Sequence, residues 1–510
     1  MSVAAHAGTA PVVRARRRAA PWWPLLALTA LAAALRFSTL GLQSLWYDEA
    51  FTPVHVLHAS LGATLHAVVH SENTPPLWYV LEWALTRVLG TGAVALRLLS
   101  ALAGVATVPV AFAIGRELSS RRAAIACAAF VAVNPLFVWY SQEARAYALF
   151  VLFAALAMLY FLRARRDPPR GARSWMDMAA FAACGSLALL THYFAVFLLA
   201  PMVLWLAFDR DRRRSALAAA GALSIVCLAL LPLISAQGGH GTQWIGQWAL
   251  SSRLQAIPQY YLTSYYGAAL GHAIELLVAL PILAGLGFGL WRVLTPREER
   301  GALIALALAA GGILLPILLV ALGADYLAPR NLVAAMIPVT ALIAVVVTAQ
   351  RSGRAGAVLA GLIAIAFIAI TVDVDLSPRL QRGDWSGLAR ALRRGAQDRV
   401  ITTVELGAAP LEYYLAPLHN LPRGTSVSVV EIDETGYAPL RPGAAGPPAP
   451  GFRLAGISDT HGLILYRFLS PVARSVSEAT LRRHVITPAH PEVLVSERVS
   501  AEHEALKRDA

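Results

Sequence analysis

The sequence predicts a mainly α-helical polytopic membrane protein, a helix bundle of about eleven spans, followed by a small α/β or α+β domain. The chain of 510 residues is 57% hydrophobic and only 14% charged. Its mean hydropathy of +0.58 is too high for an ordinary soluble protein. Apolar runs long enough to cross a bilayer recur from residue 22 to about residue 373. From about residue 376 the composition becomes that of a soluble domain, which indicates a second folding unit at residues 376–510.

The predicted transmembrane region, residues 22–375, follows a basic tail at residues 1–21. We interpret its first apolar run as an uncleaved signal anchor, because the run continues past Arg36 to about Leu42. The predicted spans lie near residues 22–42, 94–115, 123–140, 146–162, 175–190, 194–208, 215–235, 268–291, 301–322, 331–349 and 355–373.

The charge pattern predicts the orientation of these spans in the cell membrane. The formal net charge is +13, and the arginines recur in short clusters between alternate spans, as at residues 14–18, 163–166 and 210–214. Clusters of this kind mark cytoplasmic loops, so the N-terminus is expected in the cytoplasm and the C-terminus outside. A nucleic-acid surface would gather its charge on a soluble domain, so no nucleic-acid partner is expected.

Residues 43–93 are predicted to form one outward loop with helices lying at the membrane surface. The apolar stretch at residues 74–90 is short and contains Glu82 and Arg87. Counting it as a further span would reverse every later loop and place most of the arginine clusters outside.

The C-terminal domain is predicted to combine a helix with several strands. The Asp384-Trp385-Ser386 segment has the form of a helix start, and apolar or alternating runs at residues 400–404, 426–432 and 463–468 are typical of strands. The cysteines Cys127, Cys184 and Cys227 lie inside apolar runs without CxxC spacing, which favours neither a disulfide framework nor a zinc site.

An acidic pair, Asp48 and Glu49, directly follows the first span. Two adjacent acids at the mouth of a span are costly unless they act on something, so they are our candidate catalytic centre. An outward carboxylate can take a proton from an incoming hydroxyl, and its neighbour can hold a divalent cation or a hydrogen-bond network. The alternative is that both acids only interact with interfacial water.

Other outward loops carry polar residues that can have either a functional or a purely structural role. Glu143 and Arg145 can orient a substrate or bind an anion, or they can form an ion pair that anchors their loop. His192 can be a ligand or proton donor, or can cap its short turn. Arg330 can bind a lipid phosphate, or can anchor the loop at the interface. The histidines of the first loop do not have the spacing of a structural zinc site; they are His55, His58, His66 and His70.

Several motifs together resemble the family 39 glycosyltransferases of the GT-C superfamily. They are Trp46-Tyr47-Asp48-Glu49-Ala50, Thr74-Pro75-Pro76-Leu77-Trp78-Tyr79, residues 96–104 (Leu-Arg-Leu-Leu-Ser-Ala-Leu-Ala-Gly), Asn134-Pro135, residues 140–147 (Tyr-Ser-Gln-Glu-Ala-Arg-Ala-Tyr) and Thr191-His192-Tyr193. This resemblance extends over about residues 20 to 350. The family includes protein O-mannosyltransferases and, more distantly, the aminoarabinose transferase of lipid A.

The resemblance implies transfer of a sugar from a polyprenyl-phosphate-linked donor to an acceptor hydroxyl on the outer face of the membrane, with inversion. By the same resemblance, Asp48 is the base and Glu49 its partner. Glu143 and Arg145 are then expected near the donor phosphate or a metal, with His192 close by. Arg330 is the further candidate for the phosphate. The candidates for contact with acceptor or sugar are Tyr47, Tyr147 and Tyr326.

The expected partners are the lipid-linked donor, membrane lipid and a protein or glycan acceptor. The sugar, the acceptor and a divalent metal ion as cofactor are left open by the sequence. The alternative function is a transporter or flippase of a lipid-linked solute, which would place acids at mid-span and broken helices in corresponding halves.

Overall fold

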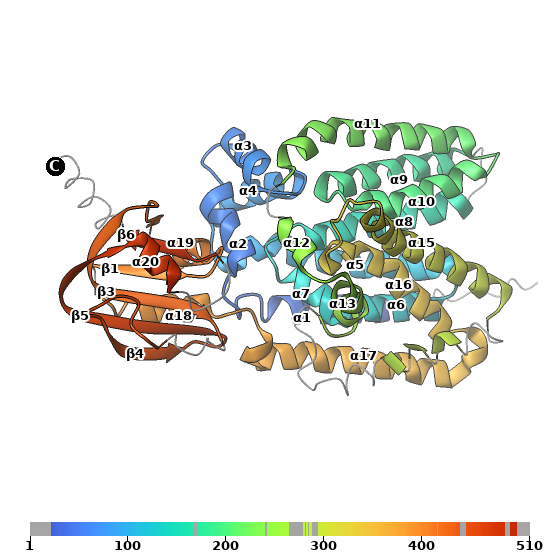
Figure 1. Cartoon of the computed structure of the whole chain (residues 1–510). Coiled ribbons are helices and arrows are strands. Elements are labelled where there is room, and N and C mark those ends of the chain that lie inside the picture. The colour runs from blue at the N-terminus through green and yellow to red at the C-terminus, as the bar shows by residue number, and fades with distance from the viewer. Residues whose placement is uncertain are drawn as a thin grey trace, which may run out of the picture.

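The computed structural model describes residues 22–496 except 167–170, 240–241, 265–278, 281, 284, 288–293, 397, 416, 439–444 and 485–489. A helix bundle occupies one end of the molecule and a β-sheet domain the other (Figure 1). Short helices of the first loop lie between them. The expected span at residues 268–291 falls largely outside the described residues.

The helices of the bundle follow the apolar runs of the sequence. They are α1 (Trp23–Phe37), α5 (Ala93–Leu118), α6 (Arg121–Val133), α7 (Pro135–Ser141), α8 (Tyr147–Arg166), α9 (Ala172–Thr191), α10 (Ala195–Phe208), α11 (Arg213–Gln237), α12 (Gln243–Gln247), α13 (Leu250–Thr263), α15 (Pro296–Ala321), η3 (Pro329–Ala335), α16 (Met336–Val347), η4 (Gln350–Ser352) and α17 (Gly353–Leu376).

The bundle has the dimensions of a membrane domain. Within the described residues, seven helices are long and apolar enough to cross a bilayer, and the bent pair α6–α7 would make an eighth. The helices α1 and α10 are apolar but shorter. The 53° bend between α6 and α7 occurs at Asn134, whose side chain accepts hydrogen bonds from the N–H groups of Leu136 and Phe137, followed by Pro135 in the first turn of α7.

The first loop is folded into short helices, as the sequence predicts for residues 43–93. These are α2 (Tyr47–Phe51), η1 (Thr52–Val56), α3 (Leu61–Ser71) and α4 (Leu77–Leu89). In α4 the side chains of Trp78, Tyr79 and Glu82 are buried. With only 13 residues, α4 is too short to span a bilayer, because a span needs about 20 residues.

The C-terminal domain contains one six-stranded sheet of order β2-β6-β1-β3-β5-β4. The neighbouring strands β1 and β3 are parallel, and all other neighbours are antiparallel. The elements are η5 (Pro378–Leu380), α18 (Trp385–Leu392), β1 (Arg399–Thr403), α19 (Ala408–Tyr414), β2 (Leu418–Asn420), β3 (Ser426–Tyr437), β4 (Arg453–Asp459), β5 (Leu463–Ser477), α20 (Glu478–Arg483) and β6 (Glu492–Ser496).

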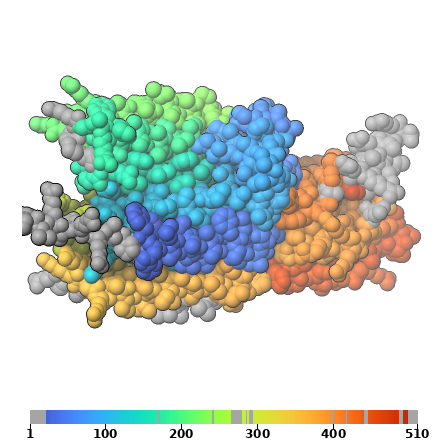
Figure 2. Space-filling model, turned by 180° about the vertical axis from the view of Figure 1, so that it is seen from behind, coloured from blue at the N-terminus to red at the C-terminus, as the bar shows by residue number. Residues whose placement is uncertain are grey.

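Each face of this sheet has its own core, because successive side chains of a strand point to opposite faces. On one face Val400 packs with Phe452 and Leu481. On the other, Ile401 packs with Trp385 of α18 and with Trp46 from the first loop. The second core therefore joins the sheet domain to the loop that carries the acidic pair, and the two parts meet closely in the space-filling view (Figure 2).

The loop segment before α2 is also hydrogen-bonded to the C-terminal domain. The Leu45 N–H donates to the Tyr414 hydroxyl at 2.7 Å, and the Ser44 hydroxyl donates to the Gly383 carbonyl at 2.9 Å. The Trp385 N–H donates in turn to the Ser44 hydroxyl at 3.0 Å. These bonds hold the start of α2 in one position against the sheet domain.

Glu82 makes the stability of the protein depend on pH. Its carboxyl is fully buried, neither of its oxygens has a hydrogen-bond partner among the described residues, and burial raises its pKa to about 8. The folded state therefore holds this proton over a pH range in which the unfolded chain has lost it. We expect the melting temperature to fall as the pH rises from about 4.5, the pKa of an exposed glutamate, to about 8, and then to level off.

This prediction is tested by melting the purified protein at several pH values. Glu82→Gln should flatten the dependence between pH 4.5 and 8, whereas Glu405→Gln, at an exposed position, should preserve it. A Glu82→Gln profile that follows the wild-type slope would contradict the assignment.

Candidate active site

Asp48 lies in the first turn of α2, where its negative charge interacts favourably with the helix N-terminus. Its carboxylate accepts a hydrogen bond from Arg330 Nη1 at 2.8 Å, and the Asp48 and Arg330 side chains are 19% and 17% exposed. The Arg330 guanidinium also lies 5.0 Å from the centre of the Trp244 ring. The structure therefore brings two of the predicted site residues into direct contact at a position that solvent can reach.

Glu49 points into the protein and is fully buried. Its two carboxylate oxygens accept hydrogen bonds from Arg97 Nε and Nη2, both at 2.7 Å, and Oε1 also accepts the Ala144 N–H at 2.8 Å. Burial alone would raise the pKa of Glu49, but the charges of Arg97 and Arg382 and these hydrogen bonds outweigh burial and lower it. Glu49 is thus an ionised anchor that holds α2 against α5.

Glu143 is also buried, beneath the predicted site. Its Oε2 accepts a hydrogen bond from Arg382 Nη2 at 2.8 Å. Burial raises the pKa of the Glu143 carboxyl, and the charge of Arg382 offsets this only in part. Arg382 lies between η5 and α18, at the start of the sheet domain, and its guanidinium lies 4.1 Å from the centre of the Trp139 ring.

Arg145 is paired with an acid of the first loop. Its Nη1 and Nη2 donate to Glu72 Oε1 and Oε2 at 3.3 and 3.1 Å, and Nη1 also lies 3.4 Å from the Asp48 carbonyl oxygen. The sequence allowed an internal ion pair between Glu143 and Arg145 as one reading. In the structure each has a different partner, so this loop is anchored by two ion pairs.

His192 lies at the end of α9 and is 4% exposed. Its Nδ1 accepts the Phe194 N–H at 3.2 Å, which leaves Nε2 as the protonated nitrogen of the neutral ring. The ring stacks on Phe150 at 4.8 Å and lies 5.9 Å from the ring of Tyr147. Burial and the charges of Arg330 and Arg145 lower the pKa of His192 to about 3, so the imidazole is neutral at physiological pH.

This low pKa predicts that His192 does not shape the pH dependence of catalysis. The pH–rate profile of a His192→Asn variant between pH 5 and 9 should have the same inflections as that of the wild type, whatever its absolute rate. An inflection near pH 6.5 that disappears in the variant would show that the histidine titrates during turnover. The comparison requires only initial rates over the pH series.

The three predicted tyrosines occupy different surroundings. Tyr147 begins α8 and interacts electrostatically with Arg330, Arg145 and Asp48, so it belongs to the site. Tyr47 packs against the core that includes Trp46 and Trp385, at the boundary with the sheet domain. Tyr326 is 50% exposed, and its contact with a substrate stays a prediction.

The acids of the site do not form a metal-binding set. No group of three histidine, cysteine or acidic side chains in the described parts of the chain is placed to hold a metal ion. Asp48, Glu49 and Glu143 each face an arginine within 2.8 Å, and this charge pairing does not fit a divalent cation. We therefore assign no step to a metal.

Two arginines were missed as parts of this site. Arg97 stands inside an apolar run, and an ionisable residue within a predicted span is a signal that could have identified it. Arg382 lies far along the chain, 239 residues from Glu143, and no local pattern connects the two. Glu72 was visible as a first-loop acid, but the sequence did not link it to Arg145.

The comparisons with known proteins agree with this architecture. Residues 73–236 match the family model described as dolichyl-phosphate-mannose-protein mannosyltransferase. This match covers less than half of the chain and begins after Asp48. No curated protein sequence matches the chain.

Solved structures match over much more of the molecule. The crystal structure of ArnT from Cupriavidus metallidurans bound to undecaprenyl phosphate covers 88% of this chain and 98% of its own, with a TM-score of 0.53 and 13% identity. The crystal structure of the same protein in the apo state covers 87% of this chain and 97% of its own, with a TM-score of 0.54 and 13% identity. The chain therefore shares the fold of ArnT. The oligosaccharyltransferase AglB from Archaeoglobus fulgidus is also similar, over 78% of this chain and 60% of its own, with a TM-score of 0.48 and 14% identity.

The family model agrees with the resemblance seen in the sequence motifs over residues 73–236, and the predicted class of fold is confirmed. The chain has a multi-helix bundle with a small sheet domain, and seven to eight described helices qualify as spans. The orientation of the termini and the domain limits at 21, 375 and 376 stay predictions.

Proposed function

We propose that this protein is a membrane glycosyltransferase of the GT-C superfamily, similar to family 39, that moves a sugar from a polyprenyl-phosphate-linked donor to an acceptor hydroxyl outside the membrane. One observation carries the proposal. The carboxylate of Asp48 is the acid of the site that is still accessible, and it lies beside Arg330 while Glu49 and Glu143 are sealed in buried ion pairs. ArnT, which has this fold, has been crystallised with undecaprenyl phosphate, which supports a polyprenyl phosphate as the leaving group.

In the proposed reaction the acceptor oxygen attacks the anomeric carbon from the side opposite the phosphate. The bond between that carbon and the phosphate oxygen breaks, so the configuration inverts and polyprenyl phosphate leaves with the electron pair. Asp48 accepts the proton of the acceptor hydroxyl as the new bond forms. Asp48 is the catalytic residue in this scheme, and Glu49 is a positioning residue that acts through α2.

The leaving phosphate needs positive charge, because its oxygen gains charge in the transition state. Arg330 is placed to supply it, since its guanidinium is partly exposed and lies next to Asp48. Arg145 adds positive charge nearby, although Glu72 is bonded to both of its terminal nitrogens. The neutral His192 can donate from Nε2 without adding a charge.

A transfer assay in proteoliposomes tests this function against the transporter alternative. Undecaprenyl-phosphate-linked sugars carrying a radiolabel are supplied in the membrane together with a cell-envelope extract as the source of acceptors, and the label is followed in both the lipid and the water-soluble fractions. If the protein is a transferase, the labelled sugar should leave the lipid, and the amount of undecaprenyl phosphate formed should equal the amount of sugar transferred. Label that crosses the bilayer still attached to its lipid would support the flippase and overturn the proposal.

The sugar and the acceptor are open within this proposal. Candidate sugars are a hexose, a pentose or an amino sugar, and candidate acceptors are protein serine or threonine, a cell-envelope glycan or a lipid. Mass spectrometry of the glycoconjugates that disappear when the chain is deleted identifies both.

A further inference from the structure

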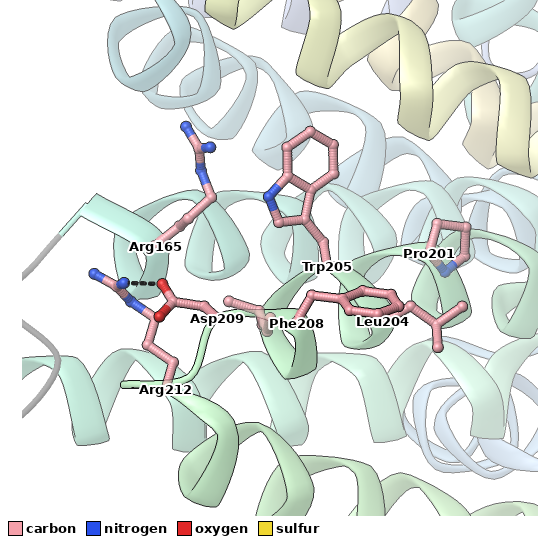
Figure 3. A pocket seen from close by; sticks show the side chains of 8 residues that line it. Arg165, Pro201, Leu204, Trp205, Phe208, Asp209 and Arg212 are labelled. Carbon is pink, nitrogen blue, oxygen red and sulfur yellow. Dashed lines mark hydrogen bonds and ion pairs between the residues drawn. The ribbon is translucent and has the colours of Figure 1, made fainter.

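A pocket with a volume of about 750 Å³ (Figure 3) lies near the end of α10, at the opposite end of the bundle from α2, which carries Asp48 (Figure 1). The helix α10 connects the two ends, because it starts at Ala195, close to His192, and ends at Phe208 in the pocket wall. The end of α8 adds Arg165, and the start of α11 follows Arg212. This is the arginine-rich end that the charge pattern places at the cytoplasmic surface.

The polar wall of the pocket has an excess of positive charge. Arg165 and Arg212 face one acid, Asp209, which is ion-paired with Arg212. Arg212 is further bonded to the Ala164 carbonyl at 3.0 Å. Within the described residues, Arg165 Nε is buried without a hydrogen-bond partner, and the guanidinium lies 5.7 Å from the centre of the Trp205 ring. The charges of Arg212 and Arg300 repel Arg165, so an anion in the pocket would stabilise it.

The remaining wall is apolar and open to the outside of the bundle. Phe208 is 81% exposed and Leu204 is 58% exposed, and both line the pocket together with Trp205. Figure 3 shows Arg165 and Arg212 at one side of the pocket and the rings of Trp205 and Phe208 beside them. A ligand whose charged head group binds at the arginines could therefore place an apolar part, such as the acyl chains of a lipid, on this surface.

We propose that this pocket, lined by Arg165, Arg212, Trp205, Phe208 and Leu204, binds an anionic phospholipid of the cytoplasmic leaflet. The phosphodiester pairs with Arg165 and the acyl chains cover Leu204 and Phe208. Basic pockets between spans on the cytoplasmic side favour lipids of this charge. A soluble phosphate compound matches the arginines but leaves the apolar wall exposed, which favours the lipid. The site lies away from Asp48 and its occupancy does not depend on the proposed transfer reaction.

The test uses the purified full chain in detergent with added dioleoylphosphatidylglycerol, and native mass spectrometry counts the bound lipid. We expect saturable binding and a higher melting temperature, with dioleoylphosphatidylcholine bound at least about tenfold more weakly. Arg165→Gln should weaken phosphatidylglycerol binding by about tenfold. The matched control Arg354→Gln removes an exposed arginine at the same end of the bundle and should bind as the wild type does.

A second variant keeps the test independent of any folding defect in Arg165→Gln. Phe208→Ser changes an exposed side chain, so it should fold normally and still bind phosphatidylglycerol several-fold more weakly. Equal affinity of the wild type and Arg165→Gln would overturn the proposal. So would equal binding of the two lipids, or displacement of phosphatidylglycerol by millimolar inorganic phosphate, which would identify a free anion as the occupant.

Discussion

Asp48→Asn is expected to lower the rate of sugar transfer by about two to four orders of magnitude, the usual contribution of a general base. The amide has nearly the same size as the carboxylate and can still contact Arg330, but it cannot take the proton of the acceptor hydroxyl. Because Asp48 is partly exposed, the substitution should leave the melting temperature nearly unchanged. The measurement is the initial rate of polyprenyl phosphate release in proteoliposomes.

Measuring how tightly Asp48→Asn binds undecaprenyl phosphate, the lipid product, distinguishes a loss of proton transfer from a loss of donor binding. Removing a negative charge beside Arg330 should leave the affinity for undecaprenyl phosphate unchanged or raise it, since repulsion between the carboxylate and the phosphate is lost. Glu117→Gln is the matched control, because Glu117 is also bonded to an arginine, Arg166 at 2.8 Å, but at the other end of the bundle. If Asp48→Asn transferred sugar as fast as Glu117→Gln, Asp48 would not be the base.

Arg97→Met is expected to lower the free energy of unfolding by about 3–5 kcal/mol, as happens when one partner of a buried ion pair is removed. The substitution leaves the Glu49 carboxylate, fully buried, without its bidentate partner. The start of α2 then loses its anchor to α5, so transfer activity should fall as well. Denaturant or thermal unfolding in micelles measures the effect.

A double-mutant cycle distinguishes this pair from a general loss of packing. Arg97→Met combined with Glu49→Gln should recover a large part of the stability, because the glutamine carries no charge and can still accept the Ala144 N–H. Arg87→Met, at an exposed arginine of the first loop, should cost less than about 1 kcal/mol. A single variant at Arg97 that is as stable as Arg87→Met would contradict the role assigned to this ion pair.

Much of the architecture followed from composition and periodicity. Apolar runs of bilayer length predicted the helices of the bundle, because a span must satisfy its own backbone hydrogen bonds and present apolar side chains to lipid. The short length and the charges of residues 74–90 predicted a surface helix, and α4 is a short helix of the first loop. The strands at 400–404, 426–432 and 463–468 correspond to β1, β3 and β5, since alternating side chains mark a sheet with two packed faces.

Composition and periodicity could not show which acid of the candidate site is accessible and which is buried. Asp48 and Glu49 are adjacent, and nothing in their local sequence distinguishes the accessible acid from the buried one. The difference arises because α2 turns Glu49 toward Arg97 on α5 and leaves Asp48 beside Arg330. Successive residues of a helix point about 100° apart, so only the surroundings decide which carboxylate is sealed.

The sequence by itself determined the membrane class, the resemblance to family 39 and the loops that carry the candidate site, because these depend on hydrophobicity, charge and short motifs. Tertiary structure alone decided which charges are paired. Arg382 reaches Glu143 from the start of the sheet domain, and Glu72 of the first loop reaches Arg145 in the loop between α7 and α8. Such pairs depend on distances between segments remote in sequence, and the energy of a buried charge is set by its partner and not by its neighbours in the chain.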